Sequence, residues 1–458
     1  MSRTKAATLI LASLLAGCAV GPNYRTPPLA ANDGYAVPSM AAAAGDDAET
    51  QQFVLGQATP HAWWTALGSP ILDDLVRQAL AQSPSLRAQQ ATLRAAKDAL
   101  RAAQGGLLPT VSVGANRTWE RYSSIPGAAG SVYSVTTAQV NVGYTLDLFG
   151  GQRRAVEGVR AQLDYARYEE IAAANTLSAE VVTTAIQRAA LRDQIAATKE
   201  MIAADNQKLS LIQDQVVAGS VGRSDLLAVK SHEESLQTTL AWLEQDLDTA
   251  RHLLAILIGR SPGEAADTDL RLADLTLPRD LPVSLPASLV AQRPDVRARS
   301  ALLHQASAQI GVADANMLPQ LNLSGDYASN LWSVTAAAWQ PVFMGGALRA
   351  QRKQALDAFE SARDDYRATV LTAFQNVADV LTALQHDQVA AQSARAALND
   401  AQGQLDLAKM RYAAGTVSVT NLLAQTQQYQ QASIASIQAD TSRYADTVAL
   451  FQALGGGW

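Results

Sequence analysis

Residues 140–151 read Val-Asn-Val-Gly-Tyr-Thr-Leu-Asp-Leu-Phe-Gly-Gly, and this stretch joins two different kinds of structure. Before the two glycines, apolar residues alternate with polar or small ones, which is the pattern of a β-strand with one apolar face. After them no proline occurs from Gln152 to Ala218, and Gly158 is the single glycine. A helix of ~67 residues would be ~100 Å long at a rise of about 1.5 Å per residue. The sequence therefore predicts a strand that leads into a very long helix.

Three further segments carry a similar alternation, at residues 111–116, 321–328 and 332–341. The last is the weakest, because Ala336-Ala337-Ala338 blurs its pattern. One apolar and one polar face are expected when one side of a strand meets lipid and the other water, although each segment alone fits a soluble half-buried strand equally well. Candidate interfacial aromatics accompany the segments: Trp119, Tyr122, Tyr133, Tyr144, Tyr327, Trp332 and Trp339.

The number of strands decides between these alternatives. Two hairpins supply four strands per chain, which cannot enclose a lumen, and an open sheet edge in lipid leaves backbone groups unpaired at several kcal/mol each. Membrane insertion therefore requires several chains to share one barrel. Three copies would give a barrel of about twelve strands.

The chain also contains an internal tandem duplication. Pro84 aligns with Pro294 at an offset of 210, Gly150-Gly151 with Gly345-Gly346 and Arg154 with Arg349 at 195, and Gly219-Ser220-Val221 with Gly415-Thr416-Val417 at 196. The change of offset predicts a longer loop in the first copy, around Ser123 to Ser131. Each copy then consists of a helix, two strands, a very long helix, a break and a helix.

The long helices carry a heptad pattern that requires neighbours along their length. Apolar residues and interrupting polar ones recur at spacings of 4 and 3. The stripe comprises Leu177, Val181, Thr184, Arg188, Leu191, Ile195, Thr198, Ile202, Asp205, Leu209, Ile212 and Val216. The pattern predicts a helical barrel or bundle, and without the strands a plain soluble coiled coil would be an equal alternative.

The N-terminus has the features of a secretory signal. Arg3 and Lys5 precede an apolar run that is too short to span a membrane. Leu15-Ala-Gly-Cys18 resembles the bacterial lipobox, which implies cleavage before Cys18 and attachment of a diacylglyceryl group to its sulfur and an acyl chain to its amino group. Ala19 then favours the outer membrane. The alternative is a chance cysteine at the end of an ordinary signal peptide.

Composition excludes several other classes of protein. The 458 residues include one cysteine and carry a net charge of −6, so a disulfide framework, a thiolate metal cluster and nucleic-acid binding are not expected. The five histidines are scattered and no nucleotide or hydrolase motif occurs, so we expect no enzyme activity, no cofactor and no metal. His232-Glu233-Glu234 is interpreted as solvated helix surface.

Several short motifs together resemble the TolC-type outer-membrane efflux factors, in particular the lipoprotein branch (NodT-like) that serves resistance-nodulation-division (RND) pumps. The motifs are Cys18-Ala-Val-Gly-Pro-Asn-Tyr-Arg-Thr-Pro27, Trp63-Trp64 before Ile71-Leu72, Arg293-Pro294-Asp295-Val296, Arg411-Tyr412 with Gly415, and Ala453-Leu-Gly-Gly-Gly-Trp458. The resemblance implies an α+β membrane channel, in which a homotrimeric 12-stranded transmembrane β-barrel continues into a long periplasmic α-helical barrel. It also implies an outer-membrane, lipid-anchored exit duct for drug efflux, with a periplasmic adaptor and an inner-membrane RND transporter as partners.

The expected organisation follows from the repeat and this resemblance. It comprises a lipoprotein signal peptide (1–17), a lipid-anchored equatorial segment (18–70), a first repeat (71–259), a Pro-rich equatorial connection (260–286) and a second repeat (287–458). The first repeat holds a hairpin at about 110–148 and helices at 152–218 and 224–258, and the second a hairpin at about 320–343 and helices at 347–414 and 420–454.

The resemblance also implies a gate at the two helix breaks, which would lie at the periplasmic tip and contact the adaptor. Gly219 and Gly415 would form the turns, although they could equally be simple turn glycines. The residues that would contribute to the gate are Arg223, Asp225, Thr420, Asn421, Leu422 and Leu423. Asp225 could equally be a helix N-terminal acid, and Ala424 stands where relatives often carry an acidic residue.

Two other functions remain open from the sequence. An outer-membrane channel for protein secretion would share the fold and differ in its partners. A periplasmic coiled-coil lipoprotein without a pore belongs to a different class, and the four alternating segments argue against it.

Overall fold

The structure is a computed structural model, and it describes residues 19–28, 34–35, 51–122, 130–264, 268–328 and 331–458. The expected signal peptide, Cys18 and most of the expected loop at Ser123 to Ser131 lie outside these residues. The chain forms two compact units. Unit 1 takes the described residues of Met1–Pro28, Ala91–Tyr168 and Arg297–Thr369, and unit 2 those of Leu29–Gln90, Glu169–Val296 and Val370–Trp458. Each unit therefore draws on both sequence repeats.

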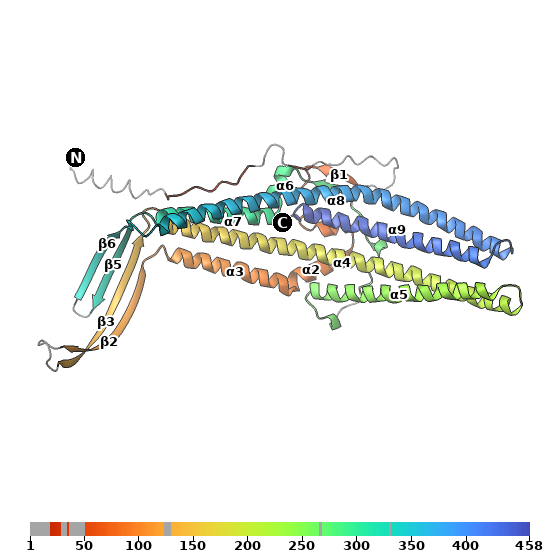
Figure 1. Ribbon diagram of the computed structural model, residues 1–458, viewed down its shortest axis with the longest axis horizontal. Coiled ribbons are helices and arrows are strands. Elements are labelled where there is room, and N and C mark those ends of the chain that lie inside the picture. The colour runs from red at the N-terminus through yellow and green to blue at the C-terminus, as the bar shows by residue number, and fades with distance from the viewer. Residues whose placement is uncertain (1–18, 29–33, 36–50, 123–129, 265–267, 329–330) are drawn as a thin grey trace. The chain divides into compact units, whose positions relative to one another are not determined.

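Unit 1 holds a four-stranded antiparallel sheet (Figure 1). Its strands are β2 (Thr110–Tyr122), β3 (Ser131–Leu146), β5 (Gln320–Ala328) and β6 (Leu331–Trp339), in that order. The segment that contains Ala336-Ala337-Ala338 forms a complete strand, since β6 pairs with β5 along its whole length. The first strand is longer than its alternating segment, since β2 continues to Tyr122 as the partner of β3.

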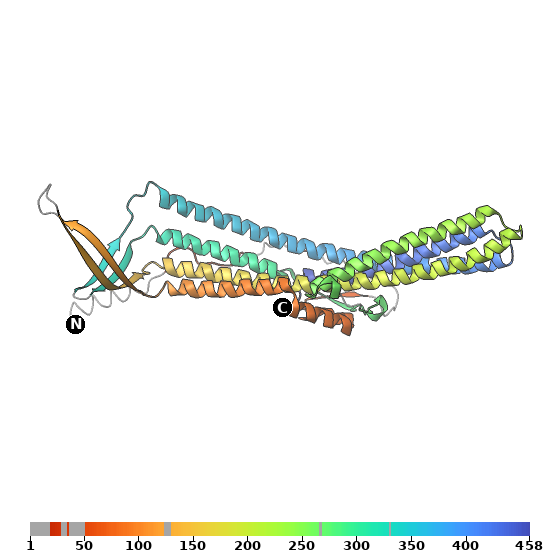
Figure 2. The same cartoon turned by 90° about the horizontal axis from the view of Figure 1, so that it is seen from below.

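The helices of unit 1 are pairs of repeat counterparts. α3 (Pro84–Gly105) and α7 (Pro294–Ala315) each have 22 residues and differ by 210 in number. α4 (Gly151–Val217) and α8 (Ala347–Ala413) each have 67 residues and differ by 196. Figures 1 and 2 both show α4 and α7 between α3 and α8 in this unit.

The offset of 195 at the diglycines is wrong by one residue. The glycine with φ of +79° before α4 is Gly150, and the corresponding φ of +84° before α8 is at Gly346. Both carbonyls accept the first helical hydrogen bond, from Arg154 and from Ala350. An extra residue within a continuous helix would rotate everything after it, so one offset must hold along the whole of α4 and α8. This offset is 196, and Arg154 therefore corresponds to Ala350.

Unit 2 contains the helices α2 (Pro70–Gln82), α5 (Arg223–Leu257), α6 (Pro286–Gln292) and α9 (Val419–Ala453) with the remaining parts of α3, α4, α7 and α8. α5 and α9 each have 35 residues and again differ by 196. A parallel pair of strands, β1 (Gln52–Leu55) and β4 (Asp280–Val283), was not anticipated from the sequence. Three short 3₁₀ helices complete the unit: η1 (Trp63–Leu67), η2 (Pro262–Glu264) and η3 (Leu272–Asp274).

The core of unit 2 confirms the heptad stripe on α4. Ten of its twelve positions, from Leu177 to Ile212, are buried, and Leu209 and Val216 pack against a buried cluster. Trp63 stacks on Phe451 with ring centroids 5.3 Å apart, which joins the N-terminal stretch to the end of α9. Among the helices of the described residues, none has the length and apolar character needed to cross a bilayer.

Candidate functional site: the paired helix breaks and the strand–helix junction

The two helix breaks lie side by side at one end of unit 2, as Figures 1 and 2 both show. The first separates α4 from α5 at residues 218–222, and the second separates α8 from α9 at residues 414–418. A hydrogen bond of 3.0 Å from the Tyr412 hydroxyl to Gln215 Oε1 joins the ends of α4 and α8. The fold therefore brings the two predicted breaks into one cluster, which we call the tip.

Both breaks end their helices with the same backbone motif. Gly219 and Gly415 have φ of +74° and +70°, the left-handed conformation that glycine adopts at little cost. The amide of Gly219 donates to Val216 O and that of Ser220 to Gln215 O, and the second break repeats this pattern from Gly415 and Thr416. A Cβ atom at either glycine would meet no atom within 4 Å, so backbone conformation rather than space requires glycine here.

The polar residues of the tip are on its surface. Arg223, Thr420 and Asn421 are exposed, and Asp225 is half-buried in the first turn of α5. The Thr420 hydroxyl donates to Asp225 Oδ1 over 3.3 Å, so the first turns of α5 and α9 are linked. The carboxylate also lies where a helix N-terminus favours negative charge.

The two leucines have a different environment from the polar residues. Leu422 and Leu423 are 5% and 6% exposed. Leu423 packs with Ile212, Val229 and Val419, and Leu422 with Leu405 and Ala408. The cavity beside them measures about 10 Å³, too small for more than one water molecule. Their side chains therefore fill the interior of the tip within a single chain.

A buried polar cluster near the tip was not predicted from the sequence. His232 is 8% exposed and its Nδ1 lies 2.5 Å from Asp205 Oδ2, so its interpretation as solvated surface is wrong. Lys208 Nζ lies 3.0 Å from Asp205 Oδ1 and donates to Thr426 Oγ1 over 3.1 Å, which connects α4 to α9. The sequence did contain a sign of this cluster. Asp205 occupies a position of the heptad stripe that is otherwise apolar, and a buried charge needs a partner.

The electrostatics of this cluster favour the charged carboxylate. Burial raises the pKa of Asp205, but the hydrogen bond with His232 and the charge of Lys208 outweigh burial. The pKa of Asp205 therefore lies below its usual value.

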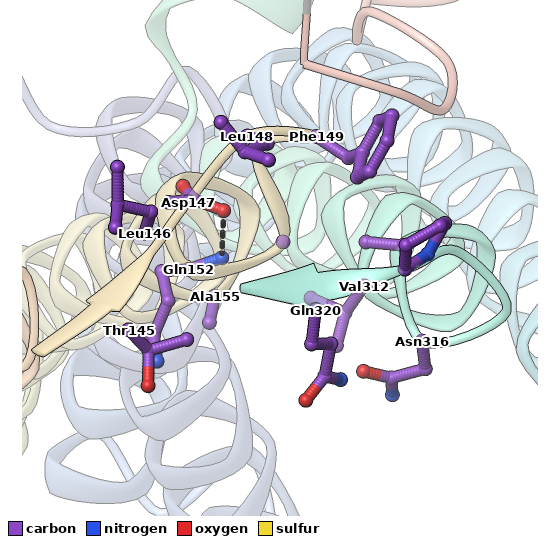
Figure 3. Close-up of a pocket in the computed structure, with 13 residues that line it drawn as sticks. Thr145, Leu146, Asp147, Leu148, Phe149, Gln152, Ala155, Val312, Asn316 and Gln320 are labelled. Atoms are coloured by element: carbon purple, nitrogen blue, oxygen red, sulfur yellow. Dashed lines mark hydrogen bonds between the residues drawn. The ribbon is translucent and has the colours of Figure 1, made fainter. Parts of the chain in front are cut away.

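The strand–helix junction in unit 1 is the second candidate site. Asp147 accepts hydrogen bonds from the amide of Gln152 at 3.1 Å (Figure 3) and from the amide of Arg153 at 2.9 Å, which caps the start of α4. A cavity of about 220 Å³ adjoins this cap. Leu146, Phe149, Val312 and Asn316 are among the side chains that line it, so the cavity has both apolar and polar walls.

The segment after Cys18 is bound to this junction. Arg154, whose side chain is 5% exposed, donates to Val20 O, Gly21 O and Asn23 Oδ1 at 3.0, 3.2 and 2.9 Å. The Tyr24 ring stacks on His304 with centroids 4.5 Å apart. Residues 19–24 are therefore fixed where β3 passes into α4, and Cys18 itself lies outside the described residues.

The apolar residues of the sheet are in register across all four strands. Pairing brings Val111, Val142, Gly325 and Val334 into one row and Val113, Val140, Tyr327 and Trp332 into another. The row between these two is polar, with Ser112, Asn141, Asp326 and Ser333. Because Val111, Val113 and Val334 are 68–79% exposed, the sheet presents an uncovered apolar face.

Comparison with known proteins agrees with this architecture. The outer membrane efflux protein family matches residues 75–260 and 285–456. The chain is 30% identical to the pyoverdine export outer membrane protein OpmQ of Pseudomonas putida over 421 residues, which cover 88% of this chain and 89% of OpmQ. The alignment therefore spans nearly the whole length of both proteins.

Two solved structures have the same fold. The outer-membrane channel OprN is 25% identical with a TM-score of 0.85, covering 96% of this chain and 100% of OprN. The CmeC outer membrane channel of Campylobacter jejuni is 20% identical with a TM-score of 0.86, covering 96% and 95%. The expected resemblance to TolC-type channels is confirmed, and these relatives are channel and efflux proteins rather than enzymes. The chain belongs to the outer membrane efflux protein family and is a protein of the outer membrane.

Proposed function

We propose that this protein is the outer-membrane exit channel of a tripartite efflux pump, through which small molecules such as drugs pass passively to the outside. The observation that carries the proposal is the sheet with one uncovered apolar face. Such a face is stable in lipid, while the polar row between would face a water-filled lumen. Membership of the efflux family and the similarity to a pyoverdine export protein support this use of the sheet.

The sheet edges support a homotrimer. Within the described residues, β2 and β6 are each paired on one side only. In lipid such edges require partners. Three copies, with four strands each, would close a barrel of twelve strands, and the long helices would continue it as a tube into the periplasm. A cysteine lipidated at position 18 would add an anchor beside the barrel, because residues 19–24 are held at the strand–helix junction.

The tip is the proposed periplasmic gate and adaptor contact. Its exposed Arg223, Thr420 and Asn421, together with Asp225, are available to a neighbouring chain or an adaptor. Leu422 and Leu423 would contribute by holding the start of α9 in place rather than by projecting into a lumen. Gly219 and Gly415 would supply the turns that the adaptor meets. An inner-membrane RND transporter would provide the energy, since the sequence carries no nucleotide-binding motif.

The expected domain organisation forms part of this proposal. The equatorial region would combine the described end of the expected N-terminal segment (18–70), residues 51–70, with the Pro-rich connection (260–286) and the C-terminus, whereas residues 19–24 lie at the strand–helix junction of unit 1. Pairing of β1 with β4 supports it. So does Gln51, whose side chain donates to both Pro278 O and Thr447 Oγ1.

The direct test is accumulation of a fluorescent pump substrate in cells that lack this chain, compared with cells complemented from an inducible promoter. We expect the deletion to raise accumulation and complementation to restore export. No difference, with the protein present in the outer membrane and its pump partners expressed, would contradict small-molecule efflux. Loss of a secreted protein from the medium instead would favour a protein-secretion channel.

A further inference from the structure

The four-stranded sheet separates its positive and negative side chains by face. Its strands, all of whose residues the structure describes, contain four charged residues: Arg117, Glu120, Arg121 and Asp326. Successive side chains of a strand point to opposite faces, so Arg117 and Arg121 share the apolar face with Val111. Glu120 and Asp326 lie on the polar face. Both arginines therefore belong to the face that would meet lipid.

The side-chain contacts agree with this assignment. On the polar face, the Tyr133 hydroxyl donates to Glu120 Oε2 over 2.7 Å. On the apolar face, the Arg117 guanidinium donates to Ser134 Oγ over 3.0 Å and lies over the Trp119 ring, 5.1 Å from its centroid. Glu120 is therefore held away from the guanidinium of Arg117, although the two residues are close in sequence.

The arginines begin where the apolar rows end. Arg117 is opposite Thr136 on β3, ten positions from Leu146 at the helix end of that strand. The residues between these two on the same face are Ala138, Val140, Val142 and Tyr144. At a rise of ~3.4 Å and a tilt of ~40°, ten positions span ~26 Å along the membrane normal. Because the apolar band of outer-membrane barrels is about 25 Å tall, Arg117 would stand at its edge.

This edge would be the outer one. The opposite end of β3 leads into α4, and in the proposed channel the long helices extend into the periplasm. β5 ends at Ala328, opposite Gln139, so the part of β2 and β3 that carries the arginines continues beyond β5 (Figure 1). Arg117 and Arg121 are both exposed there. They would therefore meet the headgroups of the outer leaflet.

The chemistry of the patch formed by Arg117, Trp119 and Arg121 suits a large anionic headgroup. Guanidinium groups bind phosphate with two parallel hydrogen bonds. Four positions along a strand separate the two arginines by ~14 Å, so they would bind two anionic groups rather than one. Trp119 lies between them and is 65% exposed, which offers an aromatic surface with a polar edge to a sugar ring.

We infer that Arg117, Trp119 and Arg121 bind the headgroup of a phosphorylated glycolipid in the outer leaflet, with one arginine on each of two phosphate groups. This inference rests on the proposed function, which places the sheet in the outer membrane. Charge complementarity favours an anionic lipid, because the patch carries two positive charges and the acids of the sheet lie on its other face.

The test is the affinity of the full-length protein, in a neutral detergent, for purified lipopolysaccharide and for the same lipid after removal of its phosphates. We expect the wild type to bind the intact lipid more tightly. Arg117→Gln with Arg121→Gln should weaken binding of the intact lipid by about thirtyfold, since each basic group at an anionic membrane surface contributes about a factor of five. This variant should no longer distinguish the two lipids.

The matched control moves one charge to the other face without changing composition. Asn116→Arg with Arg117→Asn keeps the net charge and places the guanidinium on the polar face. Its affinity for the intact lipid should fall by about fivefold. Glu120→Gln, which removes the acid of the polar face, should leave the affinity unchanged. Wild-type affinity in the exchange variant would overturn the inference, because attraction by net charge alone would then explain binding.

Two further outcomes keep this inference separate from the proposed function. The comparison of the two lipids on the wild type needs no variant, so equal affinity for both contradicts the inference even if the variants fail to fold. A wild type that conducts in planar bilayers but does not distinguish the lipids contradicts the lipid site alone. A wild type that forms no channel contradicts the proposed function as well.

Discussion

Asp205 and His232 form a buried pair between α4 and α5, with 2.5 Å between Oδ2 and Nδ1. Lys208 extends the pair to Thr426 on α9. One fully buried carboxylate thus connects three helices near the tip. The stability of the protein should therefore depend on the charge of Asp205, and a change of pH tests this dependence.

Asp205→Asn should destabilise the protein by about 3 kcal/mol at pH 7, because removing the carboxylate leaves Lys208 and the buried His232 ring without their partner. The pKa of Asp205 is lowered in the folded state, so its stabilising contribution is present above the unfolded pKa of about 3.9 and is lost as pH falls through the folded value. The measurement is the thermal midpoint of the purified protein at pH 7 and near pH 3. The difference from wild type should shrink at the lower pH.

The control for this prediction is Asp406→Asn. Asp406 pairs with Lys409 in the same i,i+3 relation as Asp205 with Lys208, but the side chains of Asp406 and Lys409 are both exposed. A loss of stability in Asp406→Asn equal to that in Asp205→Asn would show that burial is not the cause.

Asp387 should have the opposite pH dependence. Burial and the neighbouring Asp446 raise the pKa of Asp387 to about 7, against a smaller opposing effect of Arg443. A carboxyl with a raised folded pKa stabilises the protein below its unfolded pKa of about 3.9 and loses that contribution as pH rises to about 7. Asp387→Asn should therefore raise the thermal midpoint at pH 8 and change it little at pH 4. A lower midpoint at pH 8 would contradict this environment.

Leu422→Ala with Leu423→Ala should loosen the tip. Each buried leucine truncated to alanine typically costs about 2–5 kcal/mol. Loosening of the start of α9 should sensitise cells to a large antibiotic that the wild-type channel excludes. Leu407→Ala, at a position that is 50% exposed, is the control and should leave sensitivity unchanged. Unchanged antibiotic sensitivity in the double variant would show that the two leucines do not contribute to the gate.

Arg154→Ala should release the segment after Cys18 from the strand–helix junction. Arg154 makes three hydrogen bonds to residues 20–23 and an ion pair with Glu157, and its side chain is nearly inaccessible. Limited proteolysis should then cut within residues 19–28 faster than in wild type. Arg349→Ala, at an exposed arginine in the first turn of α8, should not change the rate. Equal protection in both variants would contradict the role of Arg154.

The sequence predicted the secondary structure well because its signals are local. The proline-free run placed the long helix at 152–218, and α4 covers Gly151–Val217. The alternation of Val140, Val142 and Tyr144 identified β3 because strand periodicity is set within a few residues. The glycines of the two breaks were found because few residues other than glycine adopt positive φ readily.

Features that depend on distant partners were missed. β1 and β4 are four residues each and form only because they pair across more than 200 positions of sequence. The burial of Leu422 and His232 depends on which helices pack together, and helix periodicity alone does not give that choice. Charged residues in the heptad stripe, Asp205 and Arg188, were local signs of such partners.

The most direct test of the central claim is single-channel recording with the purified protein in a planar lipid bilayer. We predict discrete current steps for the wild type and larger ones for Leu422→Ala with Leu423→Ala, because a loosened tip opens the duct further. The absence of channel currents from both proteins, with the folded oligomer confirmed in the same bilayer preparation, would contradict the account and favour a lipoprotein that forms no pore.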